Sequence, residues 1–260
     1  MRRTLNAALP ESLADALHAN YLGRYWLARA GDANEPDLLV ARALLSPGDS
    51  CIDGGANFGR FGDSFALAVG PKGRVLAIEP IPRTARLLRR VLALRHHAQV
   101  DVIEAALASA PGQGSMEVPT DQQGDANYFR AHIIEGAPAG AIEVRLETLD
   151  DLSASLPRPP SLVKLDLEGH ERAALEGATT LLGQQAAWLI ELNDDPDESS
   201  SDAYAIEALF AASGYSAWVF DADSRTVKRR RPGPRGPNVF FLLPAHLSRI
   251  AAARLTVIDA

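Results

Sequence analysis

The sequence of 260 residues is poor in cysteine and lysine, and it has no long uninterrupted hydrophobic segment. Its single cysteine, Cys51, cannot form an internal disulfide, so nothing in the composition requires an oxidising compartment. A membrane-spanning helix needs roughly 18 or more consecutive apolar residues, and the N-terminal segment lacks an apolar stretch long enough for a secretory signal. These absences predict a cytoplasmic protein in which Cys51 is a small core residue.

Positive charge is also scarce, since 33 acidic residues outnumber 26 lysines and arginines and give a formal net charge of −7. Nucleic acids and anionic membranes bind clustered positive charge, so neither is expected as the main partner. The basic run at 228–231 is too short to reverse this balance, and its neighbouring prolines and glycines indicate a solvated loop.

Short apolar runs alternate with helical stretches through much of the chain. Residues 5–45 have helical spacing, and the apolar runs that follow lie at 50–53, 74–79, 100–104, 162–166 and 187–192. This alternation predicts an α/β fold with a doubly wound, mostly parallel sheet and helices on both of its faces. Within 109–160 we expect two short strands flanking a polar loop. Near the C-terminus, the runs at 215–220 and 238–243 predict an antiparallel hairpin that closes the sheet.

A glycine-rich turn, CIDGGANFG at 51–59, follows the first predicted strand. In open parallel sheets ligands bind outside the carboxyl ends of the strands, where this turn would lie. The dinucleotide fingerprint requires glycine at its first, third and sixth positions, and Ala56 occupies the third position counted from Gly54. A carboxylate at Asp53 would also repel a pyrophosphate. The turn therefore argues against an NAD-linked oxidoreductase, although that alternative shares the same sheet.

S-adenosylmethionine suits this turn better, because it carries an ammonium and a sulfonium but no phosphate. We expect Asp53 to face the positive charge, and Gly55 and Gly59 to let the backbone approach the ligand. The helix N-terminus at about Phe58 is expected to meet the ligand's carboxylate, and Asn57 in the same turn is a further candidate for binding the cofactor. Glu79 ends the second strand, where an acid accepts hydrogen bonds from ribose hydroxyls. At the third strand, Glu104 and Ala105 are placed to meet the adenine, with simple solvent exposure of Glu104 as the alternative.

Four sequence blocks together resemble the FkbM family of S-adenosylmethionine-dependent methyltransferases. They are DGGANFG at 53–59, AIEP at 77–80, EAAL at 104–107 and VKLDLEGHE at 163–171, and the resemblance extends over about 35–193. It implies a class I methyltransferase fold, which is Rossmann-like, and O-methylation of a hydroxyl on a sugar or natural-product small molecule. On this basis residues 46–260 form the methyltransferase domain. Residues 1–45 form an N-terminal helical extension, either a lid or an interface in a homo-oligomer.

Methyl transfer to a hydroxyl requires a base or a metal, because a hydroxyl is a weak nucleophile until it loses its proton. The candidates for catalysis are Asp166, which also lies at the cofactor, Glu168 and His170. His170 has an ordinary pKa near 6.5 and is suited to accept a proton, but it could equally be a partly exposed residue at the start of a helix. Lys164 on the same strand is expected to pair with an acid.

A metal site is the alternative to a side-chain base. Asp166, Glu191 and Asn193 would supply the hard oxygen ligands that Mg²⁺ prefers, and they look similar to the metal-binding trio of cation-dependent O-methyltransferases. A function of another class also stays open, namely a non-catalytic module that binds S-adenosylmethionine as a sensor. The sequence does not identify the methyl acceptor.

Overall fold

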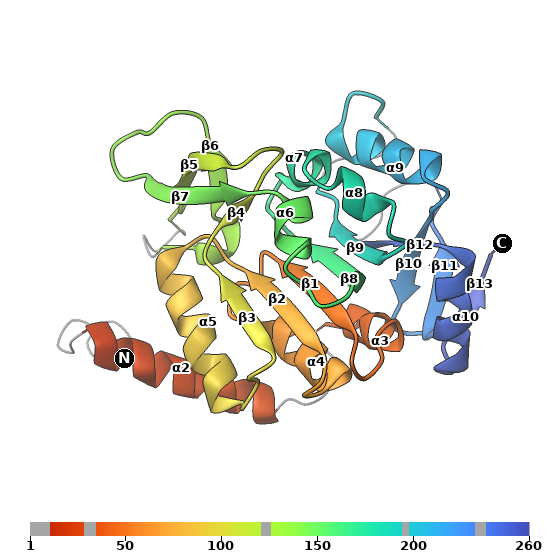
Figure 1. Cartoon of the computed structure of the whole chain (residues 1–260), viewed down its shortest axis with the longest axis horizontal. Coiled ribbons are helices and arrows are strands. Elements are labelled where there is room, and N and C mark those ends of the chain that lie inside the picture. The colour runs from red at the N-terminus through yellow and green to blue at the C-terminus, as the bar shows by residue number, and fades with distance from the viewer. Residues whose placement is uncertain (1–10, 29–34, 121–125, 194–197, 232–237, 260) are drawn as a thin grey trace.

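A computed structural model describes residues 11–28, 35–120, 126–193, 198–231 and 238–259. Its larger sheet has nine strands in the order β13-β11-β10-β12-β9-β8-β1-β2-β3 (Figure 1). The strands in this order are β13 (Thr256–Ile258), β11 (Thr226–Arg229), β10 (Ser216–Asp221), β12 (Asn238–Leu242), β9 (Ala187–Glu191), β8 (Pro160–Leu165), β1 (Ser50–Gly54), β2 (Arg74–Ile78) and β3 (Val100–Ile103).

The five strands predicted from the apolar runs are parallel neighbours, as expected from their alternation with helices. The chain order of these strands reverses beside β1, so the sheet is doubly wound. Beyond β9, β12 runs antiparallel to β9 and pairs antiparallel with β10, which confirms the terminal hairpin.

The basic run was wrongly expected to be a loop throughout. Lys228 and Arg229 lie in β11, which pairs antiparallel with β10 and extends the sheet towards β13. Lys228 is ion-paired with Asp221, and Arg229 with Asp259. The ion pairs with Asp221 and Asp259 therefore neutralise the charges of Lys228 and Arg229. The prolines and glycines beside the basic run do not predict these pairs.

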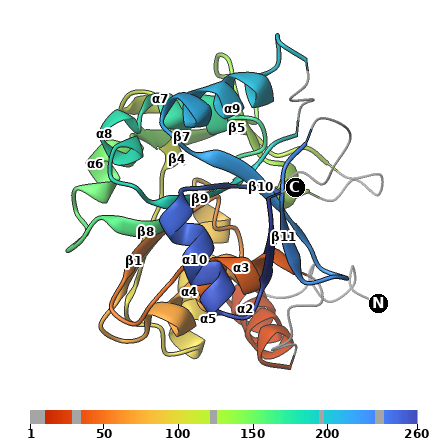
Figure 2. The ribbon, with the colours of Figure 1, turned by 90° about the vertical axis from the view of Figure 1, so that its right-hand side faces the viewer.

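Helices cover both faces of the large sheet (Figure 2). One face is covered by α6 (Leu149–Ser153), α7 (Glu171–Glu176), α8 (Thr179–Leu182) and α9 (Asp202–Ala212). The other face is covered by α3 (Asp37–Ala43), α4 (Arg60–Val69), α5 (Pro82–Leu94) and α10 (Pro244–Ala252), and α2 (Glu11–Ala28) packs on α5. None of the helices in the described ranges is long and apolar enough to cross a membrane.

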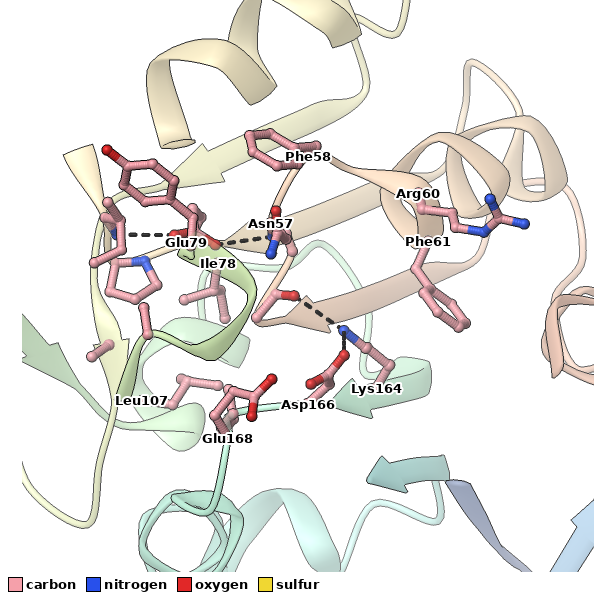
Figure 3. A pocket seen from close by; sticks show the side chains of 18 of the residues that line it. Asn57, Phe58, Arg60, Phe61, Ile78, Glu79, Leu107, Lys164, Asp166 and Glu168 are labelled. Carbon is pink, nitrogen blue, oxygen red and sulfur yellow. Dashed lines mark hydrogen bonds and ion pairs between the residues drawn. The ribbon is translucent and has the colours of Figure 1, made fainter. Parts of the chain in front are cut away.

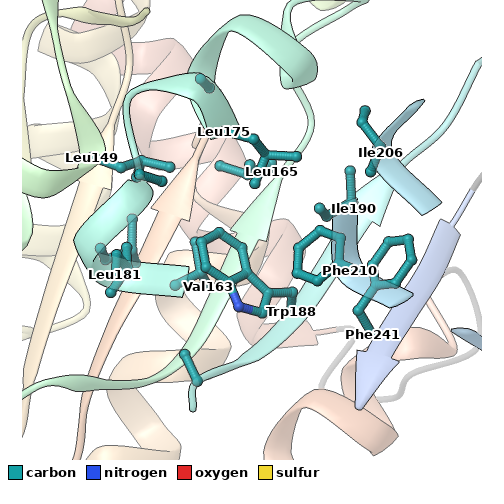
Figure 4. Close-up of a cluster of buried hydrophobic side chains, with 14 of the residues drawn as sticks. Leu149, Val163, Leu165, Leu175, Leu181, Trp188, Ile190, Ile206, Phe210 and Phe241 are labelled. Carbon is teal, nitrogen blue, oxygen red and sulfur yellow. The ribbon is translucent and has the colours of Figure 1, made fainter. Parts of the chain in front are cut away.

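Successive residues of the central strands enter different cores, because side chains of a strand alternate between its two faces. Trp188 and Ile190 pack with Phe210 of α9 on one face (Figure 4), whereas Leu189 packs on the other face. Cys51 is fully buried in this second core, which confirms its predicted role as a core residue. The two cores pack on opposite faces of the sheet and so position the ends of its strands.

A second, four-stranded sheet lies beyond the carboxyl end of β3. Its order is β4-β7-β5-β6, with β4 (Ala106–Leu107), β7 (Ile142–Glu147), β5 (Gly112–Glu117) and β6 (His132–Ile134). The two predicted strands in this region are β5 and β7, while the short strands β4 and β6 were not foreseen. A 3-10 turn at Tyr128–Arg130 precedes β6. This sheet therefore stands beside the strand ends where a ligand was expected.

Candidate functional site

A cavity of about 600 Å³ lies between the carboxyl ends of the parallel strands and the second sheet (Figure 3). The strand ends contribute residues 55–58, 78–81 and 105–107, together with Lys164, Asp166, Leu167, Glu168, His170 and Glu191. The second sheet and its turn contribute Met116, Tyr128, Ala131 and Ile133, and α2 contributes Tyr21 and Leu22. The cavity thus lies where the sheet topology predicts a ligand.

Two glycines of the first turn are required by protein contacts. Gly55 has φ of +71°, and a side chain there would overlap the backbone carbonyl oxygen of Asp166. Gly59 has φ of +83°, and a side chain there would overlap Leu88 of α5. Close packing of the turn against β8 and α5 therefore accounts for both glycines. Gly55 also lines the cavity, and Gly59 is not among the lining residues.

The sequence predicted that Asp53 faces the positive charge of the ligand, but in the structure Asp53 is not among the residues that line the cavity. Its side chain has no exposed surface, and its Oδ1 lies 3.4 Å from Nζ of Lys164. Nζ of Lys164 also lies 3.3 Å from Oδ2 of Asp166. In addition, the ammonium donates hydrogen bonds to the backbone carbonyl oxygens of Gly54 and Gly55. Lys164 therefore supplies the positive charge that pairs with Asp53. A direct contact between Asp53 and a ligand would require the buried pair to move.

Lys164 remains protonated in this position. Burial alone would lower the pKa of its ammonium, but the neighbouring carboxylates of Asp166 and Asp53 outweigh burial and raise the pKa above its ordinary value. The ammonium also lies 5.2 Å from the ring centroid of Phe61. The expectation that Lys164 pairs with an acid is confirmed, and it pairs with two acids, Asp53 on β1 and Asp166 just after β8.

Glu79 lies at the predicted place, at the end of β2 and in the cavity wall. Its Oε2 accepts a hydrogen bond of 2.9 Å from the backbone N–H of Asn57, and its Oε1 accepts one of 3.0 Å from Ile81 (Figure 3). Burial raises the pKa of Glu79 to about 7, against the lowering effect of these two hydrogen bonds. Glu79 therefore holds the first turn and the loop after β2 in register beside the cavity.

Asn57 and Ala105 line the cavity, but Glu104 does not. Within the described part of the chain, the buried side-chain oxygen of Asn57 has no hydrogen-bond partner, which leaves one acceptor for a ligand. The carboxylate of Glu104 accepts a 3.0 Å hydrogen bond from Arg89 on α5 and is 39% exposed. Of the two predicted adenine contacts, Ala105 lines the cavity, whereas Glu104 is directed to Arg89.

Three carboxylates meet at the end of the cavity near β8 and β9. One oxygen from each of Asp166, Glu168 and Glu191 lies within 4.8 Å of the others. Burial and then the nearby Asp166 raise the pKa of Glu191 to about 7, and the same two causes raise the pKa of Glu168. Burial together with the crowding of like charges therefore allows Glu191 to hold a proton near neutral pH.

His170 is in the cavity wall and immediately precedes α7. Burial lowers the pKa of its imidazole, so the ring is neutral at physiological pH and has a nitrogen free to accept a proton. Its neighbour Glu171 is 4% exposed and accepts a 2.6 Å hydrogen bond from the backbone N–H of Leu167. Glu171 therefore shapes the loop after β8 and is not a candidate for the chemistry.

Of the predicted metal ligands, Asp166 and Glu191 lie close together, and Glu168 joins them in a group of three carboxylates. The side-chain amide of Asn193 is exposed and donates a 3.3 Å hydrogen bond to Oε2 of Glu191. Three carboxylates are a donor set that Mg²⁺ accepts, so the residues fit a divalent cation by their chemistry.

Sequence reasoning missed part of the cavity wall. It did not consider the ion pair formed by Arg60 and Glu35. Arg60 Nε lies 3.4 Å from Glu35 Oε2, and both side chains line the cavity. Spacing along the chain gives no signal for this pair, because Glu35 and Arg60 meet only after α3 packs on α4.

Comparisons with known proteins point to one family. The profile described as "Methyltransferase FkbM domain" matches residues 53–217, which is more than half of the chain. The structure is similar to a methyltransferase FkbM from Methylobacillus flagellatus KT, with a TM-score of 0.51 and 15% identity over 92% of this chain and 57% of that one. The chain thus spans little more than half of that protein.

A second similar structure is the O-methyltransferase TomG from Streptomyces achromogenes, involved in tomaymycin synthesis and solved in complex with S-adenosylmethionine. Its TM-score is 0.49, with 15% identity over 90% of this chain and 91% of that one. No functionally curated protein matches the chain.

Proposed function

This chain belongs to the methyltransferase FkbM family, and we propose that it transfers the methyl group of S-adenosylmethionine to a hydroxyl of a sugar or other natural-product small molecule. The observation that carries the proposal is the cavity at the carboxyl ends of the parallel strands, which has Glu79 in one wall and three carboxylates at one end. The match to the family includes all of these residues. Methylation of oxygen, and a small acceptor, rest on the resemblance of the sequence blocks.

The residues present fit an S-adenosyl ligand. Glu79 offers the free lone pairs of its carboxylate to the ribose hydroxyls, and Ala105 offers an apolar surface to the adenine. The unpartnered oxygen of Asn57 is suited to accept a hydrogen bond from the ligand's ammonium. Asp53 acts indirectly in this proposal, because it holds Lys164 and thereby the loops after β1 and β8.

When bound, S-adenosylmethionine supplies a methyl group on a positively charged sulfur. The chain's own part is to align the acceptor hydroxyl with that methyl group and to take up its proton, and alignment alone can lower the barrier by roughly 7–11 kcal/mol in ideal cases. We propose that Asp166 orients the hydroxyl and that Glu168 accepts the proton. The raised pKa of Glu168 makes it a better base than an ordinary glutamate. Neutral His170 is the alternative base.

A divalent cation would be held by Asp166, Glu168 and Glu191, and it would lower the pKa of an acceptor hydroxyl bound to it. We expect transfer to continue in EDTA, because the ammonium of Lys164 already places a positive charge 3.3 Å from Asp166. Loss of transfer in EDTA and its recovery with Mg²⁺ would instead assign the three carboxylates as metal ligands.

Calorimetry tests the cofactor, with S-adenosylmethionine, S-adenosylhomocysteine and NAD as the three ligands. Binding of NAD alone would overturn the proposal in favour of an oxidoreductase. A screen of hydroxylated sugars and natural products for the mass gain of one methylene then tests catalysis. Binding of S-adenosylmethionine without methylation of any acceptor would favour the sensor module.

Three expectations from the sequence stay predictions. They are a cytoplasmic location, self-association through the N-terminal helices and the absence of a nucleic-acid partner.

A further inference from the structure

Two walls of the cavity come from parts of the chain outside the large sheet. One wall is α2, which contributes Tyr21 and Leu22, and the other is the turn at Tyr128–Arg130, which contributes Tyr128. α2 packs across α5 (Figure 1), where Ala19 is buried with Leu87 and Val91. The two walls are far apart in the sequence, so their relative position depends on contacts made after folding.

Arg83, in the first turn of α5, contacts both walls. Its Nε lies 3.6 Å from Oδ1 of Asp15 on α2, and the side chain of Asp15 is only 4% exposed. Its Nη1 donates a 3.1 Å hydrogen bond to the hydroxyl of Tyr128, and its guanidinium carbon lies 5.6 Å from the centre of the Tyr128 ring. Arg83 itself is not among the residues that line the cavity.

The residue just before α5 is also hydrogen-bonded to Glu79 in the cavity wall. Ile81, two residues before Arg83, donates its N–H to Glu79 and packs with Tyr128 in a small apolar cluster. A guanidinium carries N–H donors on several edges of a rigid plane. It can therefore bind a carboxylate with one edge and donate a hydrogen bond to a hydroxyl with another, as Arg83 does with Asp15 and Tyr128. A lysine ammonium is a compact point charge on a flexible stem and cannot reproduce this bridge.

We propose that Arg83 is a positioning residue that fastens α2 and the Tyr128 turn to each other beside the bound S-adenosyl ligand. The inference rests on the proposed function, because it takes this ligand as the occupant. Arg83 sets the separation of the two walls, and through them it controls how tightly the ligand is held. Its effect on binding passes through Tyr21, Leu22 and Tyr128, which line the cavity.

The test is calorimetry with S-adenosylhomocysteine on the full chain. Arg83→Ala and Arg83→Lys should each weaken binding about tenfold, the effect expected when a charge-assisted hydrogen bond is lost. Arg86→Ala is the matched control, because Arg86 Nη2 lies 4.0 Å from the same carboxylate of Asp15 and the side chain does not line the cavity. Its affinity should stay within about twofold of the wild type.

A double-mutant cycle separates positioning from a general loss of stability. Asp15→Asn and Tyr128→Phe alter different walls, and we expect their effects on affinity to be non-additive with Arg83 present and additive in Arg83→Lys. This cycle does not require Arg83→Ala to fold. Wild-type affinity in folded Arg83→Lys, or additivity in both backgrounds, would overturn the inference. Failure of the wild type to bind S-adenosylhomocysteine would instead refute the proposed cofactor, and the inference with it.

Discussion

The ammonium of Lys164 on β8 lies 3.4 Å from the carboxylate of Asp53 on the neighbouring strand β1, and neither side chain is more than 6% exposed. This pair explains why an acid can precede a glycine-rich turn at a ligand site. The negative charge is matched by a lysine on the next strand, which also contacts Asp166 in the cavity. The pair therefore links the turn after β1 to the acidic end of the cavity.

Removing one partner of this pair should destabilise the protein strongly. Lys164→Met leaves Asp53 buried without a counter-charge, and we expect the free energy of unfolding to fall by about 3–5 kcal/mol. The double variant Lys164→Met/Asp53→Asn should recover much of this loss, since no buried charge is then unpaired. Urea denaturation measures both. The control is Arg172→Met, which breaks exposed pairs with Glu176 and Asp202 and should cost less than about 1 kcal/mol.

Glu79 should make stability and binding depend on pH in opposite senses. Its pKa is raised from 4.5 to about 7 in the folded protein, so the folded state binds this proton more tightly than the unfolded state. The stability of the wild type relative to Glu79→Gln should therefore fall by about 3 kcal/mol as pH rises from about 4.5 to 7, and then level off. Urea denaturation at several pH values checks this slope, and Glu104→Gln should not change it.

The same ionisation should strengthen binding of S-adenosylmethionine as pH rises through about 7, because only the carboxylate form of Glu79 can accept two ribose hydrogen bonds while it holds two backbone N–H groups. In Glu79→Gln the affinity should be weaker and should lose this rise. Calorimetry from pH 6 to 8 measures it, and a wild-type affinity that does not change with pH would contradict the role of Glu79.

Glu168 should matter more to transfer than His170. If Glu168 is the base, Glu168→Gln should lower the turnover number by about 10²–10⁴-fold and leave the affinity for S-adenosylmethionine nearly unchanged. His170→Asn should lower turnover less than tenfold, because in this proposal the imidazole does not take the proton. Turnover with an acceptor found by the mass screen decides between them, and the reverse ranking would assign the proton to His170.

Gly55 should tolerate no side chain. Gly55→Ala combines a left-handed backbone with overlap on the carbonyl oxygen of Asp166, so β8 would have to move away from the turn. We expect a loss of stability of several kcal/mol and a loss of cofactor binding. Gly214→Ala is a matched control, because Gly214 also has positive φ but has open space around it. It should cost about 1 kcal/mol in thermal or urea unfolding.

Much of the fold could be predicted because it depends on local patterns. The five apolar runs alternate with helical stretches, and this order allows few arrangements other than a doubly wound parallel sheet. Strands β4, β6 and β13 were missed because two or three residues carry no measurable periodicity. β11 was missed because its basic residues resemble a loop until they find partners on β10 and at Asp259.

At the site, the order of the apolar runs was enough to place acids at the ends of the strands, and so it predicted Glu79, Asp166 and Glu168 beside a cavity. Which of the acids at strand ends face that cavity depends on contacts between elements that are far apart in the chain. Asp53 and Glu104 stand at strand ends as well, but Asp53 meets Lys164 beneath the cavity and Glu104 meets Arg89 outside it. The physical reason is that the direction of a carboxylate depends on the cation available to it, and that cation comes from another element of the fold.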